Sequence, residues 1–285
     1  MSGAIRLDEI RPADIDAARS RLPRAFAAPA NARALRLLLG GAAMLWLGYL
    51  MWLFEFGKLF TGLARLGVIL GLMVNWRHFA DWDHAAILTA MVETIAMSFL
   101  GTVLAAVVAL PLGLLGARNV MVSRVLRFLF RRFFDVFRGL DQLIWALVFV
   151  RAVGLGPIAG ILAIFVSDTG VLAKLYSEAI EASERGQMDG MRATGAPPLA
   201  ALRFGLLPQV LPLMVSQALY QFESNTREAT ILGLVGAGGI GLRLSERIQI
   251  NAWDQVAYII VFILVAVAVI DTLSARLRAR LIRGA

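Results

Sequence analysis

The chain has 285 residues, of which 59% are apolar, a further 26 are glycines and only 17% are charged. Soluble domains carry about 25% charged residues, so this composition and a mean hydropathy of +0.73 exclude an ordinary water-soluble globular enzyme. The net charge of +8 comes largely from arginines that gather between apolar runs, which is typical of a membrane protein and gives no reason to expect a nucleic-acid partner. The sequence has no cysteine, which excludes disulfides and metal–thiolate sites.

Apolar runs predict about six transmembrane helices in an all-α polytopic protein, because about 20 apolar residues cross a bilayer. Residues 1–34 are expected to form a polar cytoplasmic tail, since their first 31 residues include four acidic ones and no signal-peptide pattern. The first helix is predicted at 35–56, and a periplasmic or interfacial segment at 57–84 includes a glycine-broken stretch, 62–74, that is too short to cross comfortably. The other helices are predicted at about 85–110, ending near Pro111, and at 133–153, 157–176, 208–234 and 256–273.

The distribution of basic residues predicts that both termini are cytoplasmic. With the N-terminus inside, 19 of the 28 Lys and Arg residues lie in cytoplasmic segments and six in outer segments. This agrees with the positive-inside rule, whereas the opposite orientation would place those 19 residues outside.

The polar segment from Ser177 to Phe204 is then cytoplasmic and has an ordered pattern. Its helical periodicity runs to Thr194, where Gly195 and the Pro197–Pro198 pair stop it, and a second helix is expected from about Leu199. We expect this stretch, about 178–206, to form a compact elbow. A simple connector between two helices is the alternative.

Motifs of the common enzyme classes are absent from the sequence. The two histidines, His78 and His84, are six residues apart and match no zinc motif. There is no GxSxG nucleophile elbow and no GxxxxGK[ST] phosphate loop. We therefore predict no catalytic residue, no metal site and no cofactor in this chain.

Polar side chains recur at similar depth in four of the predicted helices. Charged groups in a bilayer are costly and normally face protein or water, so this set predicts a hydrated translocation pathway. Its members are Ser98, Arg138, Asp141, Gln142, Ser167, Asp168, Gln217, Gln221, Glu223, Ser224, Asn225 and Arg227.

The alternative for these polar residues is that they pair among themselves. Arg138 is three residues from Asp141, and Arg227 is expected to be neutralised by Glu223 or Glu228. Lys174, Asp271 and Glu55, near helix ends, are expected to extend their charged groups toward the interface.

Two sequence motifs resemble membrane subunits of bacterial ABC importers, which carry EAAxxxG followed by a proline thirteen residues after the glycine. Here the stretch from Asp189 to Gly195 is followed by Leu207 and Pro208 at that spacing, with Asp for Glu and Gly-Met for Ala-Ala. The run from Tyr220 to Thr230, leading into the stretch from Gly233 to Gly241, is similar to phosphonate ABC-transporter permeases. The resemblance covers about 85–280.

This resemblance implies a type I importer permease core of the bacterial inner membrane that imports phosphonate, phosphite or hypophosphite. Its implied partners are a second copy of the chain, two cytoplasmic ATPase subunits that bind ATP and Mg, and a periplasmic phosphonate-binding protein. The ATPase contact, or coupling helix, would include Asp189, Gly190, Met191, Arg192, Ala193, Thr194, Gly195, Ala196, Leu207 and Pro208. The binding-protein side would include Gly236, Ala237, Gly238, Gly239 and Gly241.

Two other classes of protein remain as alternatives. A secondary transporter would use intramembrane carboxylates such as Asp168 and Glu223, but it predicts inverted repeats that the two halves do not display. A membrane enzyme or scaffold is disfavoured by the missing motifs. Dependence of transport on ATP separates these classes from an ABC permease.

Overall fold

The computed structural model describes residues 30–283, and all regular elements in that range are helical. The chain divides into two compact units, 1–68 and 69–285. The elements are α2 (Ala30–Leu53), α3 (Gly57–Met73), η2 (Phe79–Asp81), α4 (His84–Gly116), α5 (Arg124–Gly139), α6 (Gln142–Val153), α7 (Pro157–Ala182), α8 (Arg185–Ala193), α9 (Pro198–Ala200), η3 (Ala201–Leu206), α10 (Leu207–Leu234), α11 (Gly239–Gln249) and α12 (Trp253–Arg283).

The first unit contains α2 and most of α3. The two helices are separated by a turn in which Glu55 has a φ of 48° and forms an ion pair with Lys58. The prediction that glycines break the 62–74 stretch is wrong, since α3 runs through them without interruption. Glycine costs a helix only about 1 kcal/mol, which the surrounding apolar helix formers tolerate. Most of the N-terminal tail prediction, at 1–29, lies outside the described residues.

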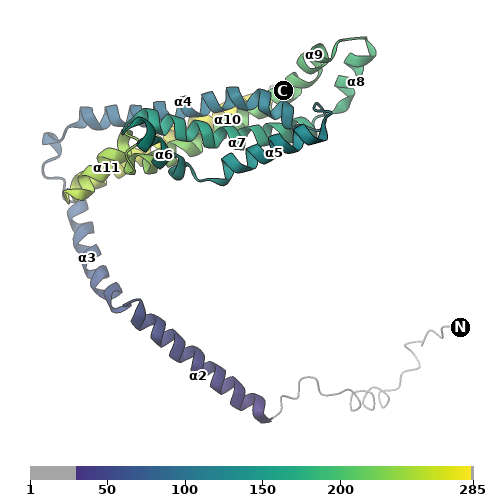
Figure 1. Ribbon diagram of the computed structural model, residues 1–285. Helices are drawn as coiled ribbons and strands as arrows, with labels where there is room; N and C mark the ends of the chain where they lie inside the picture. The colour runs from purple at the N-terminus through teal and green to yellow at the C-terminus, as the bar shows by residue number, and fades with distance from the viewer. Residues whose placement is uncertain (1–29, 284–285) are drawn as a thin grey trace, which may run out of the picture. The chain divides into compact units, whose positions relative to one another are not determined.

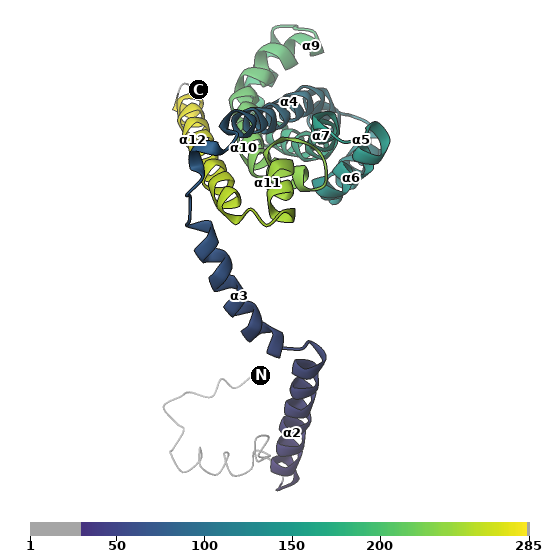
Figure 2. The same ribbon diagram turned by 90° about the vertical axis from the view of Figure 1, so that its left-hand side faces the viewer.

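In the second unit, α4, α7 and α10 run side by side (Figure 1). The pair α5–α6 lies along α7, and α12 lies along α10 on the opposite side of the bundle (Figure 2). The segment with α8 and α9 projects beyond one end of the bundle, and α11 lies at the other end (Figure 1).

Small residues explain why α4 packs closely on α7. Gly101, Ala105, Ala109 and Gly113 recur every four residues on α4 and are all buried. A Cβ at Gly101 or at Gly113 would lie only 2.7 Å from a side-chain carbon of α7. Such stripes let two helix backbones approach each other within a membrane, where packing rather than the hydrophobic effect drives helix association.

Five described helices are long and apolar enough to cross a membrane: those containing Leu35–Leu53, His84–Gly116, Pro157–Ala182, Pro198–Leu234 and Trp253–Leu281. The continuous helix predicted at 133–153 is wrong, because α5 ends at Gly139 and α6 begins at Gln142. The side chain of Asp141 causes the new start by accepting a hydrogen bond from the Leu143 amide at 2.8 Å.

Two predicted helix ends are also too early. The α4 helix continues through Pro111 to Gly116, because the residues beyond the proline are held in the core. In particular, Gly116 packs against the fully buried Phe134 of α5. The last helix extends to Arg283, ten residues past the predicted end. The prediction followed the apolar run, whereas the charged turns after it are also helical.

Candidate functional site

A buried carboxylate on α7 joins four helices through side-chain amides. Asp168 is fully buried, and its Oδ1 accepts hydrogen bonds from Gln142 of α6 at 3.1 Å and from Gln221 of α10 at 3.0 Å. Its Oδ2 accepts a 2.5 Å bond from the Asn225 amide, which also donates to Thr102 of α4 at 2.7 Å. We call these five residues the Asp168 cluster. Because each member has partners in other helices, the cluster fixes α4, α6, α7 and α10 relative to one another.

Several predicted pathway residues meet at this cluster. Ser98 of α4 donates to the Asn225 carbonyl at 3.2 Å, and Ser167 is buried next to Asp168 in the chain. No basic side chain among the described residues bonds to Asp168. The amide oxygen of Gln142 is buried and has no hydrogen-bond partner among residues 30–283, so acceptor capacity remains unused beside the carboxylate. The amide oxygen of Gln217 is buried and unpartnered in the same range.

Arg138 and Asp141 lie apart from the Asp168 cluster, at the break between α5 and α6. Both side chains are exposed. The pairing considered for them is not found: Asp141 caps α6 instead, and Arg138 has no ion pair within residues 30–283. The two charged residues are close in sequence, but the turn at Leu140 directs the Asp141 carboxylate to the backbone amide of Leu143 in the next helix.

The predicted pair of Arg227 with Glu223 is present, but the closest partner of Arg227 is another carboxylate. Its Nη1 lies 3.1 Å from both carboxylate oxygens of Asp271 on α12, and 3.7 Å from Glu223. Glu223 has a closer partner in Arg278, also on α12, at 2.8 Å. The i,i+4 pair is therefore present but secondary, because two residues of α12 compete for its members.

Other polar groups of the predicted set have local partners. Glu228, the second expected partner of Arg227, accepts a hydrogen bond from Ser224 at 3.0 Å. Lys174 was expected to extend its charged group toward the interface. Instead, it donates a hydrogen bond to Asp135 of α5 at 2.8 Å. The same correction applies to Asp271, which pairs with Arg227, whereas Glu55 is exposed and pairs with Lys58 three residues on, so its extension toward the interface remains a prediction.

The elbow has the predicted sequence of helix, turn and helix. The first helix, α8, ends at Ala193, and Gly195 follows with a φ of +78°. Glycine adopts this left-handed conformation without penalty, and the turn is closed by bonds from the Gly195 amide to Arg192 O at 3.0 Å and from the Ala196 amide to Met191 O at 3.3 Å. However, the helical periodicity read from Ser177 does not correspond to one helix, because α7 ends at Ala182 before α8 begins.

The elbow rests on the bundle through one face of α8. Met188 is buried in the core formed with Leu206 and Val210, and a Cβ at Gly205 would lie 3.2 Å from the Gln187 carbonyl. Most predicted ATPase-contact residues are exposed on the remaining surface of the elbow: Asp189, Gly190, Arg192, Ala193, Thr194, Gly195 and Pro208, with Met191, Ala196 and Leu207 half-buried.

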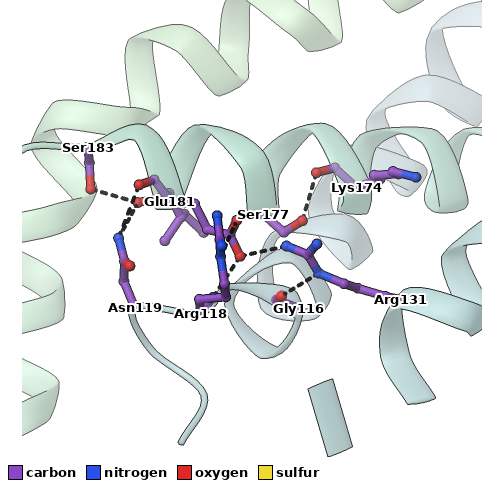
Figure 3. Close-up of polar contacts among 9 residues, drawn as sticks. Gly116, Arg118, Asn119, Arg131, Lys174, Ser177, Glu181 and Ser183 are labelled. Carbon is purple, nitrogen blue, oxygen red and sulfur yellow. Dashed lines mark hydrogen bonds and ion pairs between the residues drawn. The ribbon is translucent and has the colours of Figure 1, made fainter. Parts of the chain in front are cut away.

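A carboxylate that the sequence analysis did not single out ties the end of α7 to its neighbours (Figure 3). Glu181 accepts hydrogen bonds from the Arg118 backbone amide at 2.8 Å, from Arg118 Nε at 3.0 Å and from Arg131 Nη2 of α5 at 2.5 Å. The Asn119 amide donates to the carbonyls of Ile180 and Glu181. We call this group the Glu181 clamp. It lies four residues before α8, so α7, α5 and the loop after α4 are joined next to the elbow.

The glycine run after α10 forms a tight, buried turn at the opposite end of the bundle. Gly236, Gly238 and Gly239 have φ values of 100°, 82° and 67°, a region that other residues rarely adopt. The Gly156 amide at the start of α7 donates to Gly236 O at 3.0 Å. A Cβ at Gly241 would collide with the Thr230 carbonyl oxygen, so these glycines allow α10, α11 and α7 to approach closely.

The predicted binding-protein contact at this turn remains a prediction. All five of its residues are buried within the chain, Ala237 completely. A surface for a partner would therefore come from exposed neighbours such as Leu155, which packs over Gly236 and is 78% exposed.

The comparison with protein families identifies the chain. Residues 109–284 match the model of the binding-protein-dependent transport system inner membrane component. The chain belongs to this family. An inner membrane component of this kind is a permease subunit, which agrees with the five apolar helices and the elbow described above.

Curated relatives of this inner membrane component have related names. The putative phosphite transport system permease protein HtxC of Stutzerimonas stutzeri is 38% identical over 79% of this chain and 78% of its own length. The phosphate-import permease protein PhnE of Mycolicibacterium smegmatis is 40% identical over 68% of this chain and 36% of its own length. The putative cryptic phosphonate transport system permease protein PhnE2 of Escherichia coli is 53% identical over 41% of this chain and 96% of its own length.

Solved structures support the fold. The MetNI methionine ABC transporter in an inward-facing conformation matches with a TM-score of 0.59 over 68% of this chain and 95% of that chain, at 24% identity. The type I importer fold predicted from sequence is therefore confirmed.

Proposed function

We propose that this chain forms the membrane-spanning path of an ATP-driven importer for phosphonate or a related small phosphorus oxyanion. The observation that carries the proposal is the similarity to relatives named as phosphite, phosphate and phosphonate permeases, at 38–53% identity. The shared chemistry of these solutes is a small tetrahedral oxyanion with one or two negative charges. Phosphite and phosphate remain in the same proposal as alternative substrates.

The proposed assembly contains two copies of this chain, two ATPase subunits and a binding protein in the bacterial inner membrane. Support for the ATPase contact is the exposed surface of the elbow, which projects from the bundle (Figure 1) and is fixed to it by Met188. ATP and Mg would be bound by the ATPase subunits, because this chain has no phosphate loop. The binding protein would meet the opposite end, around the buried glycine turn.

The Asp168 cluster is proposed to line or stabilise the path at mid-depth. Its donors are carboxamides and hydroxyls, which bind an oxyanion weakly enough to release it. A carboxylate at its centre repels a passing anion, so we propose that this cluster holds the helices around the path in place, while Arg138, which is exposed and has no ion pair among residues 30–283, faces the solute.

Reconstitution tests this function. The chain, its ATPase and its binding protein would be placed in vesicles, and uptake of radiolabelled methylphosphonate and phosphite would be measured with and without ATP. Uptake that needs ATP and the binding protein, and that is reduced by excess unlabelled phosphonate, supports the proposal. Uptake that follows a proton or sodium gradient without ATP would favour the secondary transporter, and uptake of an unrelated solute alone would refute the substrate class.

A further inference from the structure

The helix α5 carries four arginines on one side. At about 100° per residue, Arg124, Arg127, Arg131 and Arg138 fall within an arc of about 60°. With a rise of about 1.5 Å per residue, they extend over about 21 Å of the helix axis. The fifth arginine, Arg132, lies about 80° beyond the edge of this arc. We call the four residues the arginine stripe.

Positive charge exceeds negative charge around the stripe. Two carboxylates contact the basic groups here, and each already has two cations: Asp135 binds Arg132 and Lys174, and Glu181 binds Arg118 and Arg131. In the part of the chain that the structure describes, Arg124, Arg127 and Arg138 have no ion pair. Three guanidinium groups of the stripe therefore lack a close carboxylate, although Arg138 also acts on Asp135 at longer range.

The stripe connects two regions that were described separately. Arg138 lies four residues before Gln142 of the Asp168 cluster, and Arg131 belongs to the Glu181 clamp beside the elbow. The helix therefore extends from the break before α6 toward the elbow, and the arginines near its two ends, Arg124 and Arg138, have no ion pair among residues 30–283.

The apolar side of α5 borders the stripe, because Phe134 lies only about 20° from Arg127 around the helix, and this side packs on the bundle. Phe134 is fully buried against Gly116 and α7. A cavity of about 450 Å³ lies between α4, α5 and α7 and is lined by apolar groups such as Phe130, Phe133 and Val108. Because this side holds α5 against α4 and α7, the direction of the arginine stripe is fixed relative to the bundle.

We propose that the arginine stripe is a binding track for phosphorus oxyanions on the elbow side of the membrane. The proposal rests on the proposed function for the identity of the solute. A guanidinium group can hold a phosphoryl group by two parallel hydrogen bonds, and neighbouring members are about 4.5–10.5 Å apart along the axis. An oxyanion near Arg138 would next meet Arg131, which is shared with Glu181 and lies about 10.5 Å away along the axis, and then Arg127 and Arg124. Water and salt screen these groups, so each site is weak and releases its ligand.

The absence of native cysteine makes the track accessible to a labelling experiment. Single cysteines would be introduced as Arg127→Cys on the stripe and Arg132→Cys beside it, a matched control because it removes the same charge from the same helix. The permease, assembled with its ATPase in phosphatidylcholine vesicles, would be treated with an anionic or a cationic methanethiosulfonate reagent. At low salt, residue 127 should react about tenfold faster with the anionic reagent than with the cationic one, because the remaining arginines attract it. Residue 132 should show less than about a threefold preference.

Protection by ligands then identifies the source of the oxyanion. Methylphosphonate or inorganic phosphate at millimolar concentration should slow anionic labelling at residue 127 and leave residue 132 unchanged, which assigns the track to the transported solute. If labelling at residue 127 is slowed only when the vesicles contain phosphatidylglycerol, and not by methylphosphonate, the oxyanion site is supported but its ligand is a lipid headgroup. Equal reagent preference at the two residues, or no protection by any of these phosphorus compounds, would overturn the proposal.

A parallel uptake measurement separates this inference from the function on which it rests. If the unaltered complex imports methylphosphonate with ATP and no protection is seen at residue 127, the track is wrong and the function stands. If phosphate protects residue 127 but the complex imports no phosphorus oxyanion, the function is wrong and the oxyanion site stands.

Discussion

Replacing Gly195 with valine tests the elbow through its backbone. Among residues 30–283, no heavy atom lies within 4 Å of an added Cβ, so the change introduces no collision there. Its cost is conformational: at a φ of +78° an L-residue loses about 1–2 kcal/mol, which corresponds to about a 5–30-fold change in an equilibrium. We expect Gly195→Val to weaken binding of the ATPase subunit to the permease by that factor, while the protein still folds and inserts.

Two further variants separate the turn from general damage. Gly195→Asn should retain ATPase affinity within about threefold, because asparagine tolerates the left-handed region. Gly186→Ala, a helical position with no atom near the added Cβ, should have no such loss. Affinity would be measured by titrating the ATPase onto permease in lipid nanodiscs, together with uptake per ATP hydrolysed. Wild-type affinity in the valine variant would refute the reasoning.

Three other changes address the remaining contacts. Glu181→Gln should lower the unfolding free energy by about 2 kcal/mol, because it loses one close charged bond and a second to a more exposed arginine; an unchanged melting temperature contradicts this. Gly241→Ala should cost about 1–3 kcal/mol by forcing the Thr230 carbonyl to move, and thermal unfolding beside Gly186→Ala measures it. Arg227→Ala should cost only about 0.5–1 kcal/mol, since its partner Asp271 is 38% exposed, and a double-mutant cycle with Asp271→Ala should recover most of that loss if they are true partners.

The apolar helices could be predicted because membrane crossing depends on length and composition alone. The α10 helix agrees with its predicted range within one residue. The break in 133–153 has only a local signal, the sequence Gly139-Leu140-Asp141, in which the aspartate can act as a helix cap. The prediction used the average hydropathy of 133–153, and that average does not reveal a local helix cap. The extension through Pro111 depends on tertiary burial and has no local signal.

Partner choice among the charges could not be deduced from sequence spacing. Glu223 and Arg227 have favourable i,i+4 spacing, yet their close partners are Arg278 and Asp271, 55 and 44 residues away. Such pairs depend on the register of α10 against α12. The same holds for Glu181, whose two arginines come from segments 50 and 63 residues earlier. The basic segment around Arg118 to Arg132 is evident in the sequence, but the sequence does not indicate that Glu181 is the carboxylate that pairs with it.

Small-residue packing was also only partly predictable. Gly67 and Gly71 of α3 have GxxxG spacing, but among the described residues no atom of another segment lies within 4 Å of either added Cβ. The stripe on α4 that holds α7 mixes glycine with alanine and matches no strict motif. Close approach depends on the size of each side chain along one helix face, so alanine serves where its Cβ fits.

The length of α12 has a mechanical consequence. Its 31 residues span about 46 Å, against about 30 Å for the hydrocarbon layer. Its apolar run, 256–273, covers about 27 Å of this length, so the arginine-rich final turns extend past the hydrocarbon layer. Two ion pairs, through Asp271 and Arg278, tie this end of α12 to α10. A shift of α12 by one helical turn, about 5.4 Å, would break both ion pairs. We therefore expect α12 and α10 to move together as one rigid body whenever the elbow is displaced.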